Sequence, residues 1–413
     1  MSITAAVRGA LPLAAVLLAA SAPAADAAWP GVNGRISLTQ RVPAQGGVRA
    51  NRDMFAYARD AVRMRITSSS DNEEQSSWAP DGRWFAYKRR DAVWVAPWDG
   101  SIAPQPLTKP SDGLTNNTQP AWSPDMRTIV FRTNRADPSV NVADIWAMDS
   151  PFGTDPGESS AHPLVVRPGD ERYPTFSPDG SRLLFRGDND GIAPSNDEEI
   201  YVANANGTGV TALTHDHALD SAPAWSPDGS RIAWESNRDG PDREIYVMNA
   251  DATDVRQLTD NDLHDEGPAW SPDGRFIAFT RSTTETDPGD VWIMRADGGD
   301  QAPLTDTPVI EESPDWQPIS FDTGDPREPR TACGDLSLRP GGVASVVAVK
   351  TGCATALNIA AAWQAGTRLQ APPVRVRSYE CSAEPHSFDQ VLVQCDHRGP
   401  KKGIAFVYRE TGL

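Results

Sequence analysis

The chain has 413 residues, 39% of them hydrophobic, and a formal net charge of −18 at pH 7. This length and composition allow a sizeable buried core. The acidity argues against nucleic acids and anionic membranes as partners, because both bind through clustered Lys and Arg. It is typical of a soluble protein, and it would also suit a surface that attracts cations or a basic partner.

Residues 1–28 have the three parts of a secretory signal peptide: Arg8 near the start, the apolar run ALPLAAVLLAA, and small residues up to Ala28. A membrane anchor is the alternative, but the run has about half of the ~20 residues that span a bilayer. No later stretch is long and apolar enough to span one. We therefore expect an exported protein, secreted or periplasmic, with no transmembrane segment in the mature chain.

A short motif recurs along the chain and organises it. An aromatic residue followed by Ser or Ala, Pro and Asp recurs every 44 to 54 residues, at Trp78, Trp122, Phe176, Trp225 and Trp270, with a degenerate WQP at Trp316. That spacing is close to the length of a four-stranded propeller blade. In the copy at 222–259, APAW, RIAWES, EIYVMN and VRQLT are typical of strands, and SPDG is typical of a tight turn.

The two ends of the repeat array complement one another. GRISLT, DMFAYARD and VRMRIT match the second to fourth strands of a blade, whereas ESPDWQPI, residues 312–319, matches a first strand alone. Joined, they make one composite blade, and five complete copies bring the total to six. A linear solenoid is the alternative, but it does not explain the split ends. We predict an all-β, six-bladed β-propeller over residues 29–319.

The residues that carry a family resemblance are PAWSPDG followed by RIAWESNRDG, EIYVMNADAT and RQLT. They resemble the TolB-like propeller repeat, over roughly 34–319. The resemblance implies the propeller fold and says little about function, because TolB has a small α/β domain before its propeller for which this chain has no room. Related propellers gate serine peptidases, but the chain has neither a hydrolase domain nor a GxSxG motif.

One polar position recurs five residues before each repeat aromatic: Glu73, Asn117, Glu171, Asp220, Asp265 and Glu311. The first strand of a blade lies nearest the channel, so these side chains are expected near one channel mouth. Neighbouring carboxylates at ~8 Å would repel by about 2 kcal/mol at an effective dielectric near 20. Ca²⁺ would relieve that repulsion. Alternatively, the side chains order the loops between blades or contact a protein partner.

Three histidines form a second candidate site. His215 and His217 lie in one inter-blade loop and His264 lies in the equivalent loop of the next blade, with carboxylates beside them. Such a group would suit a transition metal or acid–base catalysis, whereas the alternative interpretation is solvated loop residues. The repeated SPDG aspartates are interpreted as turn formers, the repeated tryptophans as packing between blades, and the long segments 150–163 and 185–200 as blade-specific insertions.

The last part of the chain carries all four cysteines: Cys333, Cys353, Cys381 and Cys395. After a polar linker over 320–332, we predict a small α+β module over 333–413 with a helix near 354–366. Two disulfides are favoured in an exported chain over a zinc site, since no CxxC or paired His accompanies the cysteines. Cys381 with Cys395, leaving Cys333 with Cys353, is the preferred pairing of three.

The sequence predicts a monomeric, non-catalytic binding propeller that contacts a protein or a cell-envelope or cell-wall partner. No cofactor is certain, and Ca²⁺ is the candidate. The alternative is a metal-assisted lyase or hydrolase that acts on carbohydrate or peptide at the channel mouth through the three histidines.

Overall fold

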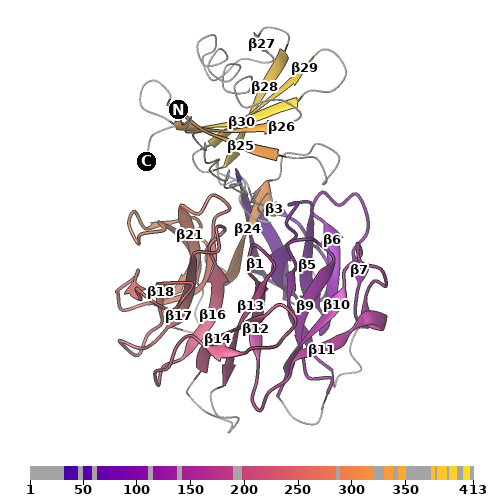
Figure 1. Cartoon of the computed structure of the whole chain (residues 1–413), viewed down its shortest axis with the longest axis vertical. Coiled ribbons are helices and arrows are strands. Elements are labelled where there is room, and N and C mark those ends of the chain that lie inside the picture. The colour runs from indigo at the N-terminus through magenta and orange to yellow at the C-terminus, as the bar shows by residue number, and fades with distance from the viewer. Residues whose placement is uncertain are drawn as a thin grey trace, which may run out of the picture.

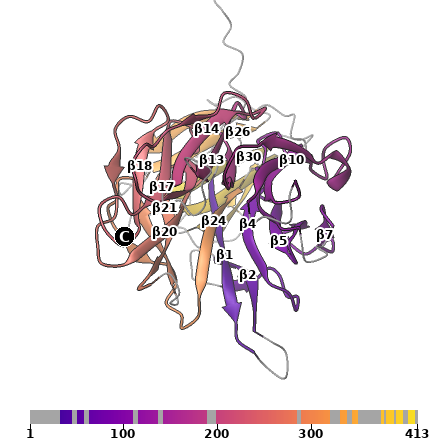
Figure 2. The ribbon, with the colours of Figure 1, turned by 90° about the horizontal axis from the view of Figure 1, so that it is seen from below.

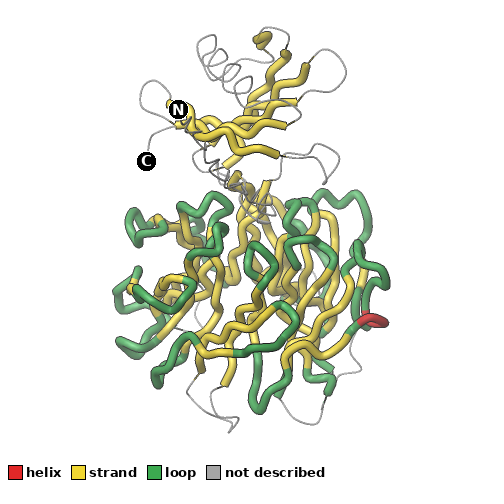
Figure 3. The backbone as a smooth tube through the Cα atoms, viewed as in Figure 1, coloured by secondary structure: helices red, strands yellow, loops and turns green. Residues whose placement is uncertain are grey.

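The fold is known from a computed structural model of the chain. It describes residues 32–44, 50–57, 63–109, 115–136, 142–188, 198–284 and 289–319, together with strands between 330 and 409. The predicted signal peptide, residues 320–329 of the predicted linker and the predicted helix near 354–366 lie outside the described residues. Strands dominate, and the one helical element in the described part is the 3-10 turn η1 (Glu158–Ser160; Figure 3).

Six four-stranded antiparallel sheets stand around a common axis, which confirms the predicted propeller (Figure 1). We number the blades in chain order and count as the first the composite blade, which is formed by both ends of the repeat array. Blade 2 contains β4 (Glu73–Trp78), β5 (Trp84–Arg89), β6 (Ala92–Pro97) and β7 (Gln105–Pro106); blade 3 contains β8 (Asn117–Trp122), β9 (Thr128–Thr133), β10 (Asp144–Asp149) and β11 (His162–Val165). Blade 4 contains β12 (Arg172–Phe176), β13 (Arg182–Asp188), β14 (Glu198–Asn204) and β15 (Thr211–Ala212). Blade 5 contains β16 (Asp220–Trp225), β17 (Arg231–Ser236), β18 (Glu244–Asn249) and β19 (Arg256–Gln257); blade 6 contains β20 (His264–Trp270), β21 (Phe276–Ser282), β22 (Asp290–Arg295) and β23 (Ala302–Pro303).

The composite blade closes the ring as predicted. Its strand order is β24 (Glu311–Ile319), β1 (Val32–Val42), β2 (Asn51–Tyr57) and β3 (Arg63–Arg65). β1 pairs antiparallel with β24, with Ile36 opposite Trp316, and Figure 2 shows the two strands side by side. The first strands of the repeat array are thus held by its last strand.

The SPDG turns have the predicted chemistry. In blade 5, Asp228 accepts hydrogen bonds from the Ser226 hydroxyl (2.6 Å) and the Ser230 N–H (3.0 Å). Gly229 has a φ of 68°, in the left-handed region that glycine adopts without strain. In blade 3 the equivalent residue is Met126, which takes a φ of 62°. The aspartates therefore form turns, as expected.

The core lies mainly between blades. Trp225 of blade 5 packs with Leu184 and Ile200 of blade 4, and the other repeat tryptophans are equally buried, with 1–5% exposure. This confirms their predicted role in inter-blade packing. Phe176, the aromatic of blade 4, is only partly buried against the cluster that blades 3 and 4 share.

The C-terminal strands form a separate antiparallel sheet in the order β25-β26-β30-β29-β28-β27. Their bounds are β25 (Arg330–Ser337), β26 (Val343–Val349), β27 (Val374–Val376), β28 (Tyr379–Ser387), β29 (Gln390–His397) and β30 (Gly403–Arg409). β25 begins within the predicted linker, because residues 330–332 pair with 347–349 of β26. Cys381 of β28 lies opposite Cys395 of β29 in the strand register, so the preferred disulfide stays a prediction that this register allows.

No helix in the described residues is long and apolar enough to cross a membrane.

Candidate functional site

The six polar residues that recur before each aromatic lie at the junctions between blades. All are buried, with 0–1% exposure. At four of these positions the backbone N–H donates to the carbonyl of the residue just before the third strand of the preceding blade, as from Glu171 to Ala143 (2.9 Å) and from Asp265 to Arg243 (2.7 Å). At these four positions the bond ties a blade to the one before it.

In blades 5 and 6 an arginine of the same blade holds the buried carboxylate. Asp265 accepts two hydrogen bonds from Arg281, from Nε at 2.6 Å and from Nη2 at 2.7 Å. Asp220 accepts two from Nη2 of Arg238, at 2.9 and 2.7 Å, and a third from the Trp234 indole at 3.2 Å. The guanidinium groups balance the charge of these carboxylates where the sequence had suggested a bound cation.

The other junctions differ in how the polar residue is held. In blade 2, Glu73 lies 3.7 Å from Nε of Arg89. In blade 3 the uncharged Asn117 accepts from the Thr133 hydroxyl at 2.8 Å and from Nη2 of Arg135 at 2.9 Å. In the composite blade the partners are neutral, since Glu311 accepts from the Gln40 amide at 2.7 Å and the Tyr57 hydroxyl at 3.2 Å. Burial raises the pKa of Glu311 above its usual value and, with Glu311 nearby, raises the pKa of Tyr57 to about 12.

Glu171 of blade 4 is the exception. Neither oxygen of its carboxylate has a hydrogen-bond partner among the described residues, and the Arg167 guanidinium stays 3.8 Å away. Burial raises the pKa of Glu171 to about 9; Arg167 opposes the shift and neighbouring carboxylates, among them Asp144, add to it. Glu171 is therefore protonated at neutral pH.

The carboxylates do not gather into one ligand set. Among the described residues, the group of three whose oxygens lie within metal-binding reach of one another is Glu199, Asp216 and Asp220. Arg238 already binds both aspartates of that group, through Asp216 at 3.0 Å and Asp220 at 2.7 Å. A Ca²⁺ ion would have to displace this guanidinium, so the geometry favours arginine-paired junctions, and calcium binding stays a prediction.

The histidines are not part of that group. His215 and His217 are exposed, and His264, half-buried at the start of β20, accepts a hydrogen bond through Nδ1 from the Arg243 N–H at 3.3 Å. The catalytic role suggested for them stays a prediction.

The sequence did not reveal a ring of β-bulges two residues after the junction residues. The residue there has a positive φ in every blade: Gln75, Gln119, Tyr173, Ala222, Gly267 and Ser313, from 48° to 60°. Neighbouring blades satisfy some of these N–H groups, as when Gln119 donates to Gln75 (3.2 Å) and Tyr173 donates to Gln119 (3.0 Å). The glycine in DEGPAW, where blade 5 has DSAPAW, was the available signal.

Comparison with known proteins agrees with the propeller fold. A family model described as the TolB beta propeller domain matches residues 158–321. The propeller is TolB-like.

The Tol-Pal system protein TolB of Anaeromyxobacter dehalogenans is 36% identical to this chain over 109 residues, which are 26% of the chain and 21% of that protein. The chain thus spans about a fifth of the curated relatives that it matches. Solved structures of TolB from Acinetobacter baumannii (TM-score 0.55, 23% identity, 69% of this chain and 67% of that one) and of putative TolB from Agrobacterium tumefaciens (0.52, 18%, 70% and 99%) share the fold.

Proposed function

We propose that this TolB-like propeller is a non-catalytic scaffold for protein–protein contacts in the cell envelope. The observation that carries the proposal is the local similarity to TolB proteins of the Tol-Pal system. The junction residues add support, because the repeated polar side chains of blades 5 and 6 are bonded into the fold by arginines. An exported location, secreted or periplasmic, belongs to the same proposal.

The alternative is a metal-assisted lyase or hydrolase. It needs the three histidines to act together, yet the metal-capable group in the described part of the chain contains no histidine. Replacing His215, His217 and His264 together by Ala should leave partner binding intact. A loss of activity on carbohydrate or peptide substrates in that variant, with the fold unchanged, would favour the enzyme.

In-cell cross-linking tests the scaffold proposal. A tagged chain is expressed in its native host, cross-linked with a membrane-impermeant reagent and purified, and the adducts are identified by mass spectrometry. Discrete adducts with envelope proteins are expected. A chain that gives no adduct, or that the reagent cannot reach in intact cells, would contradict an envelope scaffold.

Calorimetric titration of Ca²⁺ into the chelator-stripped protein tests the cofactor proposal separately. Micromolar binding that disappears when Asp220, Asp265 and Glu311 are replaced by Asn or Gln would establish a cation site at the junctions. Because arginines already pair with two of these carboxylates, we expect no micromolar binding.

A further inference from the structure

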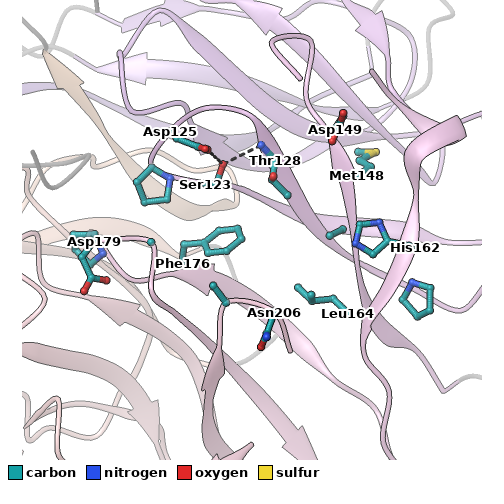
Figure 4. Close-up of a pocket in the computed structure, with 16 residues that line it drawn as sticks. Ser123, Asp125, Thr128, Met148, Asp149, His162, Leu164, Phe176, Asp179 and Asn206 are labelled. Carbon is teal, nitrogen blue, oxygen red and sulfur yellow. Dashed lines mark hydrogen bonds between the residues drawn. The ribbon is translucent and has the colours of Figure 1, made fainter. Parts of the chain in front are cut away.

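A groove of about 670 Å³ opens between blades 3 and 4, on the side of the SPDG turns (Figure 4). Its volume lies in the range of ligand-binding pockets, roughly 300–1,000 Å³. It is lined by the SPDG turn of blade 4, the equivalent SPDM turn of blade 3, the end of β10, β11 and the turn after β14. Phe176 lies near the middle, with Asp125, Asp149 and Asp179 around it.

The groove exists because two positions of the repeat carry smaller residues here than in the other blades. The five other blades have a tryptophan where blade 4 has Phe176. The residue of the preceding blade that covers this aromatic is also large elsewhere: Trp84 packs with the cluster of Trp122, and Phe276 packs with that of Trp316. At the groove the covering residue is Thr128. Both the aromatic side chain and the side chain that lies over it are therefore smaller here than at the other junctions.

The chain itself shows what fills this space at other junctions. Arg182 of blade 4 lies over the Trp225 ring, 5.8 Å from its centroid, and Arg231 of blade 5 lies over the Trp270 ring at 4.6 Å. Thr128 occupies the position of these arginines in the repeat. The groove therefore has an aromatic floor at a place where the fold elsewhere supplies a guanidinium.

The charge of the groove suits a cation. The sixteen residues that line it include three aspartates and neither Lys nor Arg. A hydrogen bond from the Asp155 N–H, with others from Thr154, lowers the pKa of Asp149, and hydrogen bonds from Ser177 and Ser181 lower the pKa of Asp179. Both carboxylates are ionised at neutral pH, beside the apolar surfaces of Phe176 and Leu164.

We propose that this groove docks an arginine side chain of a partner protein, stacked on Phe176 and paired with the surrounding aspartates. The occupant takes the place that Arg182 and Arg231 hold at the next two junctions. Three prolines of the wall, Pro124, Pro163 and Pro178, present a rigid apolar rim for the residues that flank the arginine. The proposal rests on the scaffold function and gives it a site.

Fluorescence polarisation with the full mature chain tests the site. The probe is fluorescein-labelled Gly-Pro-Arg-Leu-Gly amide, and its control carries citrulline, which keeps the shape of arginine without the charge. The arginine peptide should bind at least about tenfold more tightly than the citrulline peptide. Equal binding of the two peptides, or no binding of the arginine peptide at millimolar concentration, would overturn the proposal.

Two variants close the groove with residues that the repeat uses elsewhere, so both should fold. Thr128→Arg supplies the missing arginine, and Phe176→Trp supplies the missing indole. Each should weaken peptide binding at least about tenfold while thermal unfolding occurs at the same or a higher temperature. Unchanged binding by a folded Thr128→Arg variant would refute the site.

A matched pair of aspartates tests the charge. Asp179 and Asp228 accept the same turn hydrogen bonds, from a serine hydroxyl at 2.6 Å and a serine N–H at 3.0 Å, but Asp228 does not line the groove. Asp179→Asn should weaken peptide binding and Asp228→Asn should not; an equal effect of the two would contradict the proposal. Competition by free arginine as strong as by the peptide would instead indicate a small-molecule site and exclude protein docking.

The in-cell cross-links keep this proposal distinct from the scaffold function. If the native chain and Thr128→Arg give the same adducts, the scaffold function stands and the groove is not the docking site. If the native chain gives no adduct but still binds the arginine peptide specifically, the scaffold function fails and the groove remains a binding site.

Discussion

Three successive junctions, beginning with the one between blades 3 and 4, are built from the same repeat positions. The first differs from the other two both at the buried acidic residue and at the repeat aromatic. At the later junctions Asp220 and Asp265 are bonded to arginines, and Trp225 and Trp270 lie under arginines of the preceding blade. At the junction between blades 3 and 4 the carboxyl group of Glu171 has no hydrogen-bond partner among the described residues, and Phe176 borders an open groove. One repeat can therefore make both a closed, stabilising junction and an open one suited to binding.

Breaking a closed junction should have the largest effect. Asp265→Asn removes the charge that the Arg281 guanidinium binds in a fully buried position. Because an unpaired charge is left behind, we expect a loss of about 3–5 kcal/mol in the free energy of unfolding, measured in urea. A loss below about 1 kcal/mol would show that the pair does not hold the junction.

The contact between the turn of blade 2 at Gly82 and β24 of the composite blade should tolerate an added methyl group less well than the turn beside the groove does. A Cβ on Gly82 would lie 1.8 Å from the carbonyl oxygen of Pro318 in β24, whereas on Gly180, beside the groove, its nearest neighbour would be Pro124 at 3.6 Å. Both glycines have positive φ, so the backbone strain is shared. Gly82→Ala should lower the unfolding free energy by at least about 2 kcal/mol more than Gly180→Ala, since β24 must move. Equal losses would mean that β24 yields easily.

Exchanging the aromatics should convert one kind of junction into the other. Trp225→Phe leaves space beneath Arg182 and should cost roughly 1–2 kcal/mol, less than a truncation to Ala. Phe176→Trp should raise the unfolding free energy by about 0.5–2 kcal/mol by filling the groove. Thermal unfolding of both variants measures the effect, and destabilisation by Phe176→Trp would show that the groove cannot accept the indole.

The pH dependence of stability should distinguish Glu171 from the paired carboxylates. Its pKa is raised to about 9 in the folded state, whereas the unfolded chain ionises near 4.5, so the folded state holds an extra proton between these values. Its contribution is therefore lost as pH rises from about 5 to 9, at no more than about 1.4 kcal/mol per pH unit. Glu171→Gln should flatten that slope in urea unfolding between pH 5 and 9, and an unchanged slope would place the titration elsewhere.

The repeat made the propeller predictable, because an SPDG turn and four strand patterns recur at blade length and the two ends complement each other. The recurring carboxylates were equally visible, but their partners were not. The missed signal was an arginine near the end of the second strand of the same blade, as Arg238 lies 18 residues after Asp220 and Arg281 lies 16 residues after Asp265. The groove depends on the absence of bulk at Thr128 and Phe176 together, and only the packing of two blades reveals that these positions meet.

The pairing of β1 with β24 also sets the order of assembly during synthesis. The composite blade cannot be completed until residues 311–319 have left the ribosome, because they form its first strand. Until then β1 presents an unpaired edge, and contacts between such distant parts of a chain form slowly. A ring sealed by its last strand therefore remains unfinished, and open to chaperones, for nearly the whole time that the repeats are being translated.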